Sequence, residues 1–591
     1  MKNLLLWLFL AISSFVMAQN PELAAMYFDK GEFEKAVVLY EDGYAKQPHA
    51  QFNYPRLLIC YQELQQFAKA EKLIQDRISK YSQLQAYVDL GYTYQLQNKN
   101  ELATKTYNIA LDQIKQNQNY VYSIAREFEN RVLLDYAINA YELAISLNPD
   151  LNFDYQLSLL YGQKGMFDKM IDKILDYTDK NQNSLPMVQN MLSRYMNEDA
   201  NGNFSNLLRK GLLIRIQKSQ EVFWSHFLSW YFVQQQEYDK AFVHEKAIFT
   251  REGSNLNKLI SLAYAASSEE KNETAELISN FILENTQDQS IQIQLTVLKN
   301  KIALKKAKPA DFPAIKSLLS SQINSFGITK NSLPLVLQTA KFYGFQLANF
   351  NDSKNLIDQL LKLPLQTFEV AQVKDLLADL YLSNEKFNQA IVYYAQIQDD
   401  LKNHEFGHEA QFKMAQASYF KTDFDWAKKQ YKVLKQSTSL LIANDALEMY
   451  LLINDVTQQD TAKVSLTKFA KADFLKFKNK LTEAKQAYTQ ILKEHTGDAI
   501  EDVTLYRLAE VEKELGNTTT AISHLEQLLN KFPESIYRDD AFYLLGIWYE
   551  VLENPTKAQE NFEHIILNHQ DSIYFLEAQT KYRKLRGDKN I

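Results

Sequence analysis

Glycine and proline are scarce in this sequence. Its 591 residues include only 15 Gly and 11 Pro, against average usages of roughly 7% and 5%. Folds made of short strands, dinucleotide-binding folds and hydrolase folds need these residues for left-handed positions and tight reversals. The shortage argues against all three classes and favours helices joined by short polar turns. Because the chain is longer than one compact core usually serves, several modules or one long array are expected.

Cysteine is also in short supply, and positive charge is slightly outnumbered by negative charge. Cys60 is the single cysteine, which excludes an internal disulfide, a C-x-x-C redox pair and a cysteine-rich zinc site. It lies between Ile59 and Tyr61, where a small buried apolar side chain is expected. The formal net charge is −7 and the lysines are dispersed among carboxylates. This pattern disfavours nucleic acid or an anionic lipid surface as the main partner.

Long apolar runs are confined to the N-terminus. Lys2 precedes an apolar run from Leu4 to Val16, and Val16 and Ala18 are small residues at the −3 and −1 positions of a cleavage site. Residues 1–18 are therefore predicted to be a bacterial Sec-type signal peptide. No later stretch reaches about 18 uninterrupted apolar residues, so no integral membrane insertion is expected. Without a cysteine at the cleavage point a lipid anchor is not expected. The predicted destination is the periplasm, and any association with the outer membrane would run through partners.

A small residue recurs at a nearly constant interval along the chain. The first markers are Ala36, Ala70, Ala103, Ala137 and, with a larger side chain, Met170, spaced by 34, 33, 34 and 33 residues. An aromatic residue stands nine positions before each marker: Tyr27, Tyr61, Tyr94, Phe128 and Tyr161. A large residue stands four positions after it: Tyr40, Ile74, Tyr107, Tyr141 and Ile174. This spacing predicts helical hairpins that approach closely at the small residue and pack through the large ones.

The pattern resembles the tetratricopeptide repeat (TPR) family, most clearly over residues 87–110. Leu90-Gly91 and Tyr94 match the first part of the family pattern, and Ala103 and Tyr107 match the second. Further copies are marked by Ala241, Ala275, Ala390, Ala427, Ala484, Ala521 and Ala558. The resemblance covers most of the chain and implies an all-α fold, a TPR-type solenoid of helical hairpins with irregular helical segments in the middle.

Five segments are expected from these patterns. After the signal peptide come an N-terminal TPR array at 19–180, a divergent helical segment at 181–334, TPR-like repeats at 335–466 and a C-terminal TPR array at 467–591. In the last segment the marker spacing lengthens to 37 residues. This longer form is similar to repeats of periplasmic outer-membrane assembly lipoproteins and of the Tol-Pal-associated division coordinator. The missing lipid-accepting cysteine is a departure from the former.

One catalytic motif occurs in the sequence. His404 to His408 reads H-E-x-x-H, which on a helix would place two imidazoles on one face to bind zinc, with Glu405 as general base. The repeat register instead places His404 in the turn between repeats, Lys402 and Glu409 flank the motif, and no third ligand is evident. We therefore predict polar residues that cap a hairpin, with no catalytic residue, no metal site and no cofactor.

The resemblance places a partner-binding groove on the first helix of each hairpin. Its predicted positions are Val88, Tyr92, Gln95, Tyr122, Arg126, Glu129, Tyr506, Glu510, Lys513, Tyr543, Ile547 and Glu550. The Lys/Asn constellation by which some TPR proteins hold a terminal carboxylate is not reproduced there. A folded or extended protein partner is expected instead. The 35 Tyr and 34 Phe are interpreted as helix-packing residues in preference to a sugar-binding cleft.

The predicted function is that of a non-catalytic periplasmic scaffold that binds proteins of the cell envelope, in outer-membrane biogenesis, peptidoglycan remodelling or secretion. Two alternatives remain open at this point: a zinc peptidase that uses residues 404–408, and a glycan- or nutrient-binding receptor. Within the scaffold hypothesis, the C-terminal array and its basic end, Lys581 to Arg586, are a predicted partner-binding segment.

Overall fold

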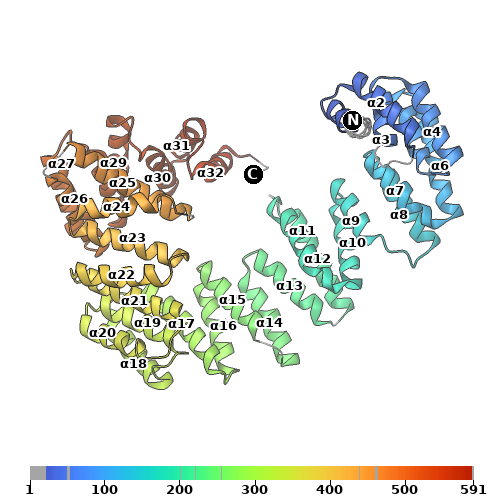
Figure 1. The fold of residues 1–591 in the computed structure, drawn as a ribbon. Helices are drawn as coiled ribbons and strands as arrows, with labels where there is room; N and C mark the ends of the chain where they lie inside the picture. The colour runs from blue at the N-terminus through green and yellow to red at the C-terminus, as the bar shows by residue number, and fades with distance from the viewer. Residues whose placement is uncertain are drawn as a thin grey trace, which may run out of the picture. The chain divides into compact units, whose positions relative to one another are not determined.

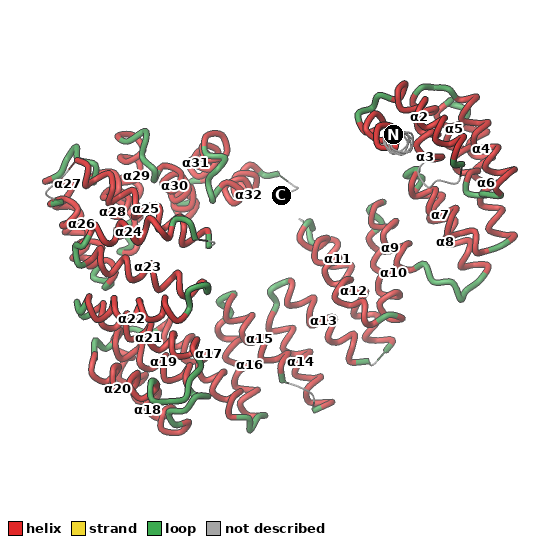
Figure 2. Tube along the Cα trace, in the orientation of Figure 1, coloured by secondary structure: helices red, strands yellow, loops and turns green. Residues whose placement is uncertain are grey.

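The computed structural model describes residues 21–48, 53–199, 201–219, 221–253, 256–437, 439–459 and 463–588. The predicted signal peptide lies outside these residues. Throughout the described part, the regular elements are helices and no strand occurs (Figure 2). None of its helices is long and apolar enough to cross a membrane. The chain divides into two compact units, Met1–Trp224 and Ser225–Ile591.

Unit 1 is a succession of helical hairpins (Figure 1). Residues 21–29 form its first helix. The helices that follow are α2 (Phe33–Lys46), α3 (Asn53–Glu63), α4 (Phe67–Tyr81), α5 (Ala86–Leu96), α6 (Asn100–Gln116), α7 (Val121–Asn130), α8 (Leu134–Leu147), α9 (Asp154–Gln163), α10 (Phe167–Lys180), α11 (Leu185–Asn197) and α12 (Asn203–Lys218).

Unit 2 continues the same construction, and the division between the units falls inside α13 (Val222–Gln234). Its next helices are α14 (Tyr238–Glu252), α15 (Asn257–Ser268), α16 (Asn272–Glu284), α17 (Gln289–Lys306), α18 (Phe312–Phe326), α19 (Leu333–Lys341), the π-helix η4 (Phe342–Gln346), α20 (Phe350–Leu360), α21 (Thr367–Ser383) and α22 (Phe387–Asp400). The C-terminal part holds α23 (Glu405–Phe420), α24 (Phe424–Leu434), α25 (Leu440–Gln459), α26 (Val464–Phe477), α27 (Leu481–Glu494), α28 (Glu501–Glu514), α29 (Thr518–Lys531), α30 (Arg538–Val551), α31 (Pro555–Asn568) and α32 (Phe575–Arg586).

The small marker residues lie where the helices of a hairpin meet. The five first markers are at most 3% exposed. Close approach is clearest at Gly91 in α5, where an added Cβ would lie 2.4 Å from Cε1 of Tyr107 in α6. Packing of this kind, hairpin after hairpin, confirms the predicted all-α fold with TPR-type hairpins stacked as a solenoid within each unit.

Each hairpin turns through one residue in the left-handed region. These residues stand five positions before the markers: Gly31, Gln65, Asn98, Val132, Gly165, Gln236, Glu270, Ala348, Glu385, Thr422, Asn479, Gly516 and Glu553. The next amide donates back to the first helix, as Leu133 N does to the carbonyl of Phe128 at 2.9 Å. This is the Schellman arrangement, in which glycine usually takes the left-handed position. The turns therefore require a residue with positive φ. Because glycine is scarce in this chain, most of these positions are held by other residues.

Tyrosines connect the hairpins by hydrogen bonds as well as by packing. Within a hairpin, the Tyr141 hydroxyl donates to Glu129 at 2.7 Å. Between hairpins, the Tyr61 hydroxyl donates to Glu41 at 2.7 Å and that of Tyr549 to Glu526 at 2.6 Å. Many tyrosine rings are buried, and Tyr394 and Tyr488 are fully so. The interpretation of the aromatic residues as packing residues is thereby confirmed.

Three segments depart from the simple repeat. The helix α17 has 18 residues and is longer than the described helices before it, which agrees with the irregular lengths expected in the middle of the chain. The hairpin of α19, η4 and α20 turns through Ala348 and was not marked in the sequence. The third departure is α25, a helix of 20 residues between the hairpins α23–α24 and α26–α27.

Candidate functional site

The H-E-x-x-H segment lies at the start of α23. His404 is the N-cap, and its Nδ1 accepts a hydrogen bond from the amide of Phe406 at 3.0 Å. His408 Nδ1 instead lies 3.1 Å from the hydroxyl of Ser437. An added Cβ on Gly407 would lie 2.1 Å from the carbonyl oxygen of Leu401, so a close backbone contact explains this glycine. The predicted capping role is confirmed for His404. Across the described ranges, no group of three or more His, Cys, Asp or Glu side chains is placed to hold a metal ion.

Four first helices of unit 2 present polar stripes that meet one another. In α23 the stripe runs through Glu409, Lys413, Gln416 and Phe420, which share one helix face because they are three or four residues apart. Lys413 Nζ reaches back to α21, where it lies 2.8 Å from Asp375 Oδ1 and 3.1 Å from Asp379 Oδ2. Burial and Asp379 raise the pKa of Asp375 to about 6. Two carboxylates thus share one cation between α21 and α23.

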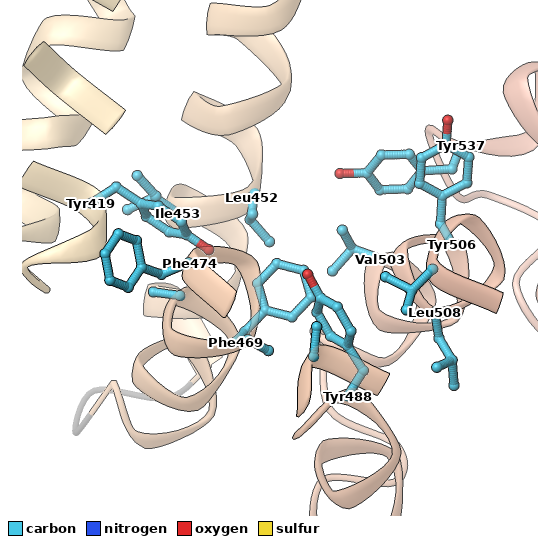
Figure 3. Packing of buried hydrophobic residues seen from close by; sticks show 14 of the residues in the cluster. Tyr419, Leu452, Ile453, Phe469, Phe474, Tyr488, Val503, Tyr506, Leu508 and Tyr537 are labelled. Atoms are coloured by element: carbon cyan, nitrogen blue, oxygen red, sulfur yellow. The ribbon is translucent and has the colours of Figure 1, made fainter. Parts of the chain in front are cut away.

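A cavity of about 340 Å³ follows on the same side of the array. Its walls come from α23, α25, α26 and α28. Phe420, Met449 and Phe477 supply apolar surface, and Phe477 is 41% exposed. The polar lining residues are Gln416, Tyr419, Asp473, Lys476, Arg507 and Glu514. Figure 3 shows the buried apolar packing of this region, with Tyr419 and Ile453 on one side, Tyr506 and Tyr537 on the other, and Leu452 of α25 between them.

Two of the lining cations, Arg507 and Lys476, form ion pairs with Glu448 and Glu510. These four residues are here called the floor of the cavity. Arg507 Nη2 donates to Glu448 of α25 at 2.6 Å, and its Nη1 donates to Glu510 at 3.0 Å. Lys476 Nζ in α26 donates to the same Glu510 at 2.7 Å. Burial opposes the charge on Arg507, but Glu510 and Glu448 outweigh it and keep the pKa of the guanidinium well above its usual value. The cations of the floor are therefore already neutralised within the chain.

Asp473 is the buried acid of the cluster. It accepts hydrogen bonds from the hydroxyl of Tyr419 at 2.9 Å and from that of Tyr488. Burial raises its pKa. The neighbouring Tyr431 is fully buried, and its hydroxyl has no hydrogen-bond partner within the described part of the chain. Buried polar groups of this kind are uncommon and call for an explanation.

Unit 1 holds a comparable polar cluster between its first helices α3, α5 and α7. Asp89 accepts from the hydroxyl of Tyr54 at 2.7 Å and from Arg131 Nε at 3.1 Å. Arg131 also donates to Glu127 at 3.2 Å and to Gln62 at 3.3 Å. Burial and Asp89 raise the pKa of Glu127 to about 7. This cluster joins three consecutive hairpins through charge as well as packing.

The predicted groove residues of unit 1 are only partly accessible. Val88 is fully buried and so does not face a groove, which corrects its assignment. Tyr92 lies under the guanidinium of Arg131, 5.0 Å from its ring centre. Gln95 accepts from the Tyr107 hydroxyl at 2.9 Å, as Glu129 does from Tyr141. Tyr122 and Arg126 are exposed, so they remain available for contact.

The predicted residues of unit 2 show the same division. Tyr506 is 8% exposed and stacks on Tyr537, while Glu510 belongs to the ion-paired floor described above. Lys513 donates to the hydroxyl of Thr518 at 3.1 Å. The three remaining positions lie in α30: Tyr543 stacks on Tyr574 at 4.1 Å, Ile547 is half-buried, and Glu550 accepts from Lys581 at 2.9 Å.

The basic C-terminal end is partly neutralised. Lys581 pairs with Glu550, and Arg586 pairs with Asp588. Arg583 and Lys584 are exposed. The predicted patch is therefore smaller than the sequence implied.

Comparison with known proteins bears on the segment beside the cavity. Residues 504–535, which include most of α28 and all of α29, match the tetratricopeptide repeat family. Over these residues the chain is similar to a tetratricopeptide repeat. No curated protein matches it.

Two solved structures align with nearly the whole length of the chain. The structure of Naa15/Naa10 bound to HypK-THB is 11% identical, with 97% of this chain and 96% of that chain covered, at a TM-score of 0.29. The APC/C hetero-tetramer Cut9-Hcn1 is 11% identical, with 95% of each chain covered, at a TM-score of 0.19. At such TM-scores neither likeness bears on function.

Proposed function

We propose that this chain is an exported, non-catalytic scaffold of the periplasm that binds envelope proteins through the stripes of α21, α23, α26 and α28, here called the inner face. One observation carries the proposal: α23, α25, α26 and α28 bring charged and apolar side chains together around a cavity that includes the exposed ring of Phe477, and Lys413 joins α21 to this group. TPR arrays generally leave such a surface for peptides or partner domains because each hairpin contacts only its neighbours.

A protein partner fits this surface better than a small molecule does. The stripes extend from Asp375 in α21 to Glu514 in α28, well beyond the cavity itself. A small ligand would be enclosed by a deep pocket that buries most of its surface, whereas here functional groups are distributed over successive helices. Partners in outer-membrane biogenesis, peptidoglycan remodelling or secretion are all compatible with this proposal.

Export is the second part of the proposal and rests on residues 1–18. Lys2, the apolar run from Leu4 to Val16 and Ala18 support cleavage by a signal peptidase. Fractionation of the native cells should release the protein with the periplasmic contents, and its N-terminal sequence should begin at Gln19. Recovery of full-length protein beginning at Met1 in the cytoplasmic fraction would contradict export.

Photo-crosslinking in cells tests the binding face. A photoreactive phenylalanine analogue replaces Phe477 in the full-length protein, and a matched protein carries it at Val433, which is 62% exposed on the second helix α24. We expect a crosslinked protein partner from position 477 and none from position 433. Equal crosslinking at both positions, or none at position 477, would refute the inner face as a binding surface.

A further inference from the structure

The inner face carries more negative than positive charge. Lys413, Lys476 and Arg507 are its three cations. Seven carboxylates stand around them: the pairs Asp375 with Asp379 and Glu448 with Glu510, together with Glu409, Asp473 and Glu514. With every group ionised the net charge of these ten residues is −4. The excess of carboxylates is distributed over successive helices and is not confined to one.

Two of the carboxylates are left over after internal pairing. Glu409 and Glu514 are both exposed, and neither has an ion-pair or hydrogen-bond partner within the residues that the structure describes. Glu409 lies near enough to Asp375 to raise the pKa of that acid further. Glu514 lines the cavity beside Phe420, Phe477 and Met449. A carboxylate at the edge of an apolar cavity is suited to hold the charged end of a long side chain whose stem lies on the apolar wall.

The surroundings of the Tyr431 hydroxyl are a second indication of excess negative charge in this region. This hydroxyl is fully buried and has no hydrogen-bond partner among the described residues, and burial together with the charges of Asp473, Glu448 and Asp445 raises its pKa. The charge of these carboxylates thus acts on the Tyr431 hydroxyl. A cationic side chain from a partner would offset this charge.

We infer that the inner face of unit 2 binds an extended, basic segment of a partner protein, with an arginine or lysine side chain inserted in the cavity against Phe477 and its charge near Glu514. This inference rests on the proposed function and adds the chemistry of the partner. An arginine there would also lie on an aromatic face, an interaction of about 0.5–2 kcal/mol in general. Further basic side chains would lie near Glu409 and the Asp375–Asp379 pair.

The spacing of the helices sets the spacing of the basic residues. Neighbouring helices pack about 8–10 Å apart, and an extended chain of the polyproline II type advances about 3.1 Å per residue with three residues per turn, so that every third side chain lies on the same side. Basic residues at every third position would therefore meet successive helices. The probe is a fluorescein-labelled nonapeptide with arginine at every third position and serine between, and its counterpart has glutamate in place of arginine.

Fluorescence anisotropy with the full mature protein tests the inference. We expect the arginine peptide to bind at least tenfold more tightly than the glutamate peptide, with affinity that falls as salt is added. The double variant Glu409→Gln with Glu514→Gln should weaken binding of the arginine peptide at least threefold. The matched control is Glu101→Gln with Glu560→Gln, which removes two exposed carboxylates from the second helices α6 and α31 and should leave affinity unchanged.

The outcomes separate this inference from the proposed function. Equal affinity for the two peptides, or equal weakening by both double variants, overturns the basic-segment inference, because binding would then be unspecific. The partner peptide crosslinked at position 477 gives an independent result: a segment rich in arginine or lysine supports the inference, and an acidic or purely apolar segment overturns it while the proposed function stands. Failure to crosslink any protein at position 477 overturns both.

Discussion

Val132 offers a direct test of the turn geometry in unit 1. It stands at the left-handed position between α7 and α8 with φ of 56°, and its side chain is 74% exposed. A β-branched residue is poorly suited to this conformation. Replacement by glycine removes the conflict and sacrifices almost no packing. Val132→Gly is therefore expected to stabilise the hairpin.

The magnitude follows from the balance of two effects. The left-handed conformation costs a residue with a Cβ roughly 1–2 kcal/mol. Part of this gain is lost because glycine makes the unfolded chain more flexible, an effect of about 0.5–1 kcal/mol. The net expectation is about 1 kcal/mol of added stability. The amide of Leu133 still donates to Phe128 at 2.9 Å, so the turn keeps its hydrogen bond.

Native-state hydrogen exchange on the full-length protein measures this locally. Amides of α7 and α8 should exchange about fivefold more slowly in Val132→Gly, since a tenfold change corresponds to about 1.4 kcal/mol. The reciprocal variant is Gly165→Val in the α9–α10 turn, where φ is 69° and no atom lies within 4 Å of the added Cβ. It should accelerate exchange there. Val38→Gly, within α2 and 61% exposed, should cost about 1 kcal/mol as an ordinary helical substitution.

The reasoning would be refuted by one clear pattern. If Val132→Gly accelerates exchange as Val38→Gly does, while Gly165→Val has no effect, then residue conformation at these turns does not limit stability. Unchanged exchange in all three variants would likewise show that the hairpins do not open individually.

Three further predictions concern other sites. Gly91→Leu should lower the thermal midpoint of unit 1, because overpacking costs about 1–3 kcal/mol and even the first added carbon meets Tyr107; an unchanged midpoint would place the close helix contact elsewhere. Because the pKa of Glu127 is raised on folding, the stability that this residue contributes is fully present below pH 4.5 and is lost as pH rises through about 7. The loss in the free energy of unfolding is up to about 3 kcal/mol. Glu127→Gln should therefore remove most of the difference in the local stability of α5 and α7 between about pH 5 and about pH 8, measured by hydrogen exchange, and persistence of that local difference would exclude Glu127 as its source. His404→Ala with His408→Ala should leave zinc content by mass spectrometry unchanged and cost about 1 kcal/mol through the lost cap; stoichiometric zinc that disappears in the double variant would contradict the capping role.

The hairpins could be predicted because their strongest signal is steric. Ala36, Ala103 and Ala390 are buried where two helices meet, and a small side chain is what such a contact requires. The hairpin around Ala348 lacked this signal because Ser353 stands at its marker position and a π-helix ends its first helix. A hairpin without a small apolar marker is therefore identified only when the residue with positive φ in its turn is known.

The inner face was harder to predict because a helix rotates by about 100° per residue. In α28 the groove was expected at Tyr506, Glu510 and Lys513, whereas the stripe consists of Arg507, Glu510 and Glu514. The two sets share Glu510, and their other members differ by one residue. In α5 the same one-residue offset led to the buried Val88 being predicted in place of its polar neighbour Asp89. Nothing in the repeat pattern indicated that α25 would add Glu448 to this cluster.

Glu448 also affects how this part of the chain folds. It accepts hydrogen bonds from Arg507 and from Tyr537, which are 59 and 89 residues away in sequence. Hairpin contacts, by comparison, join residues within one or two repeats. Proteins with more distant contacts fold more slowly, and chains fold progressively during synthesis. The hairpins before α25 can therefore form as they emerge, whereas the surroundings of Glu448 are completed only after Tyr537 has been synthesised.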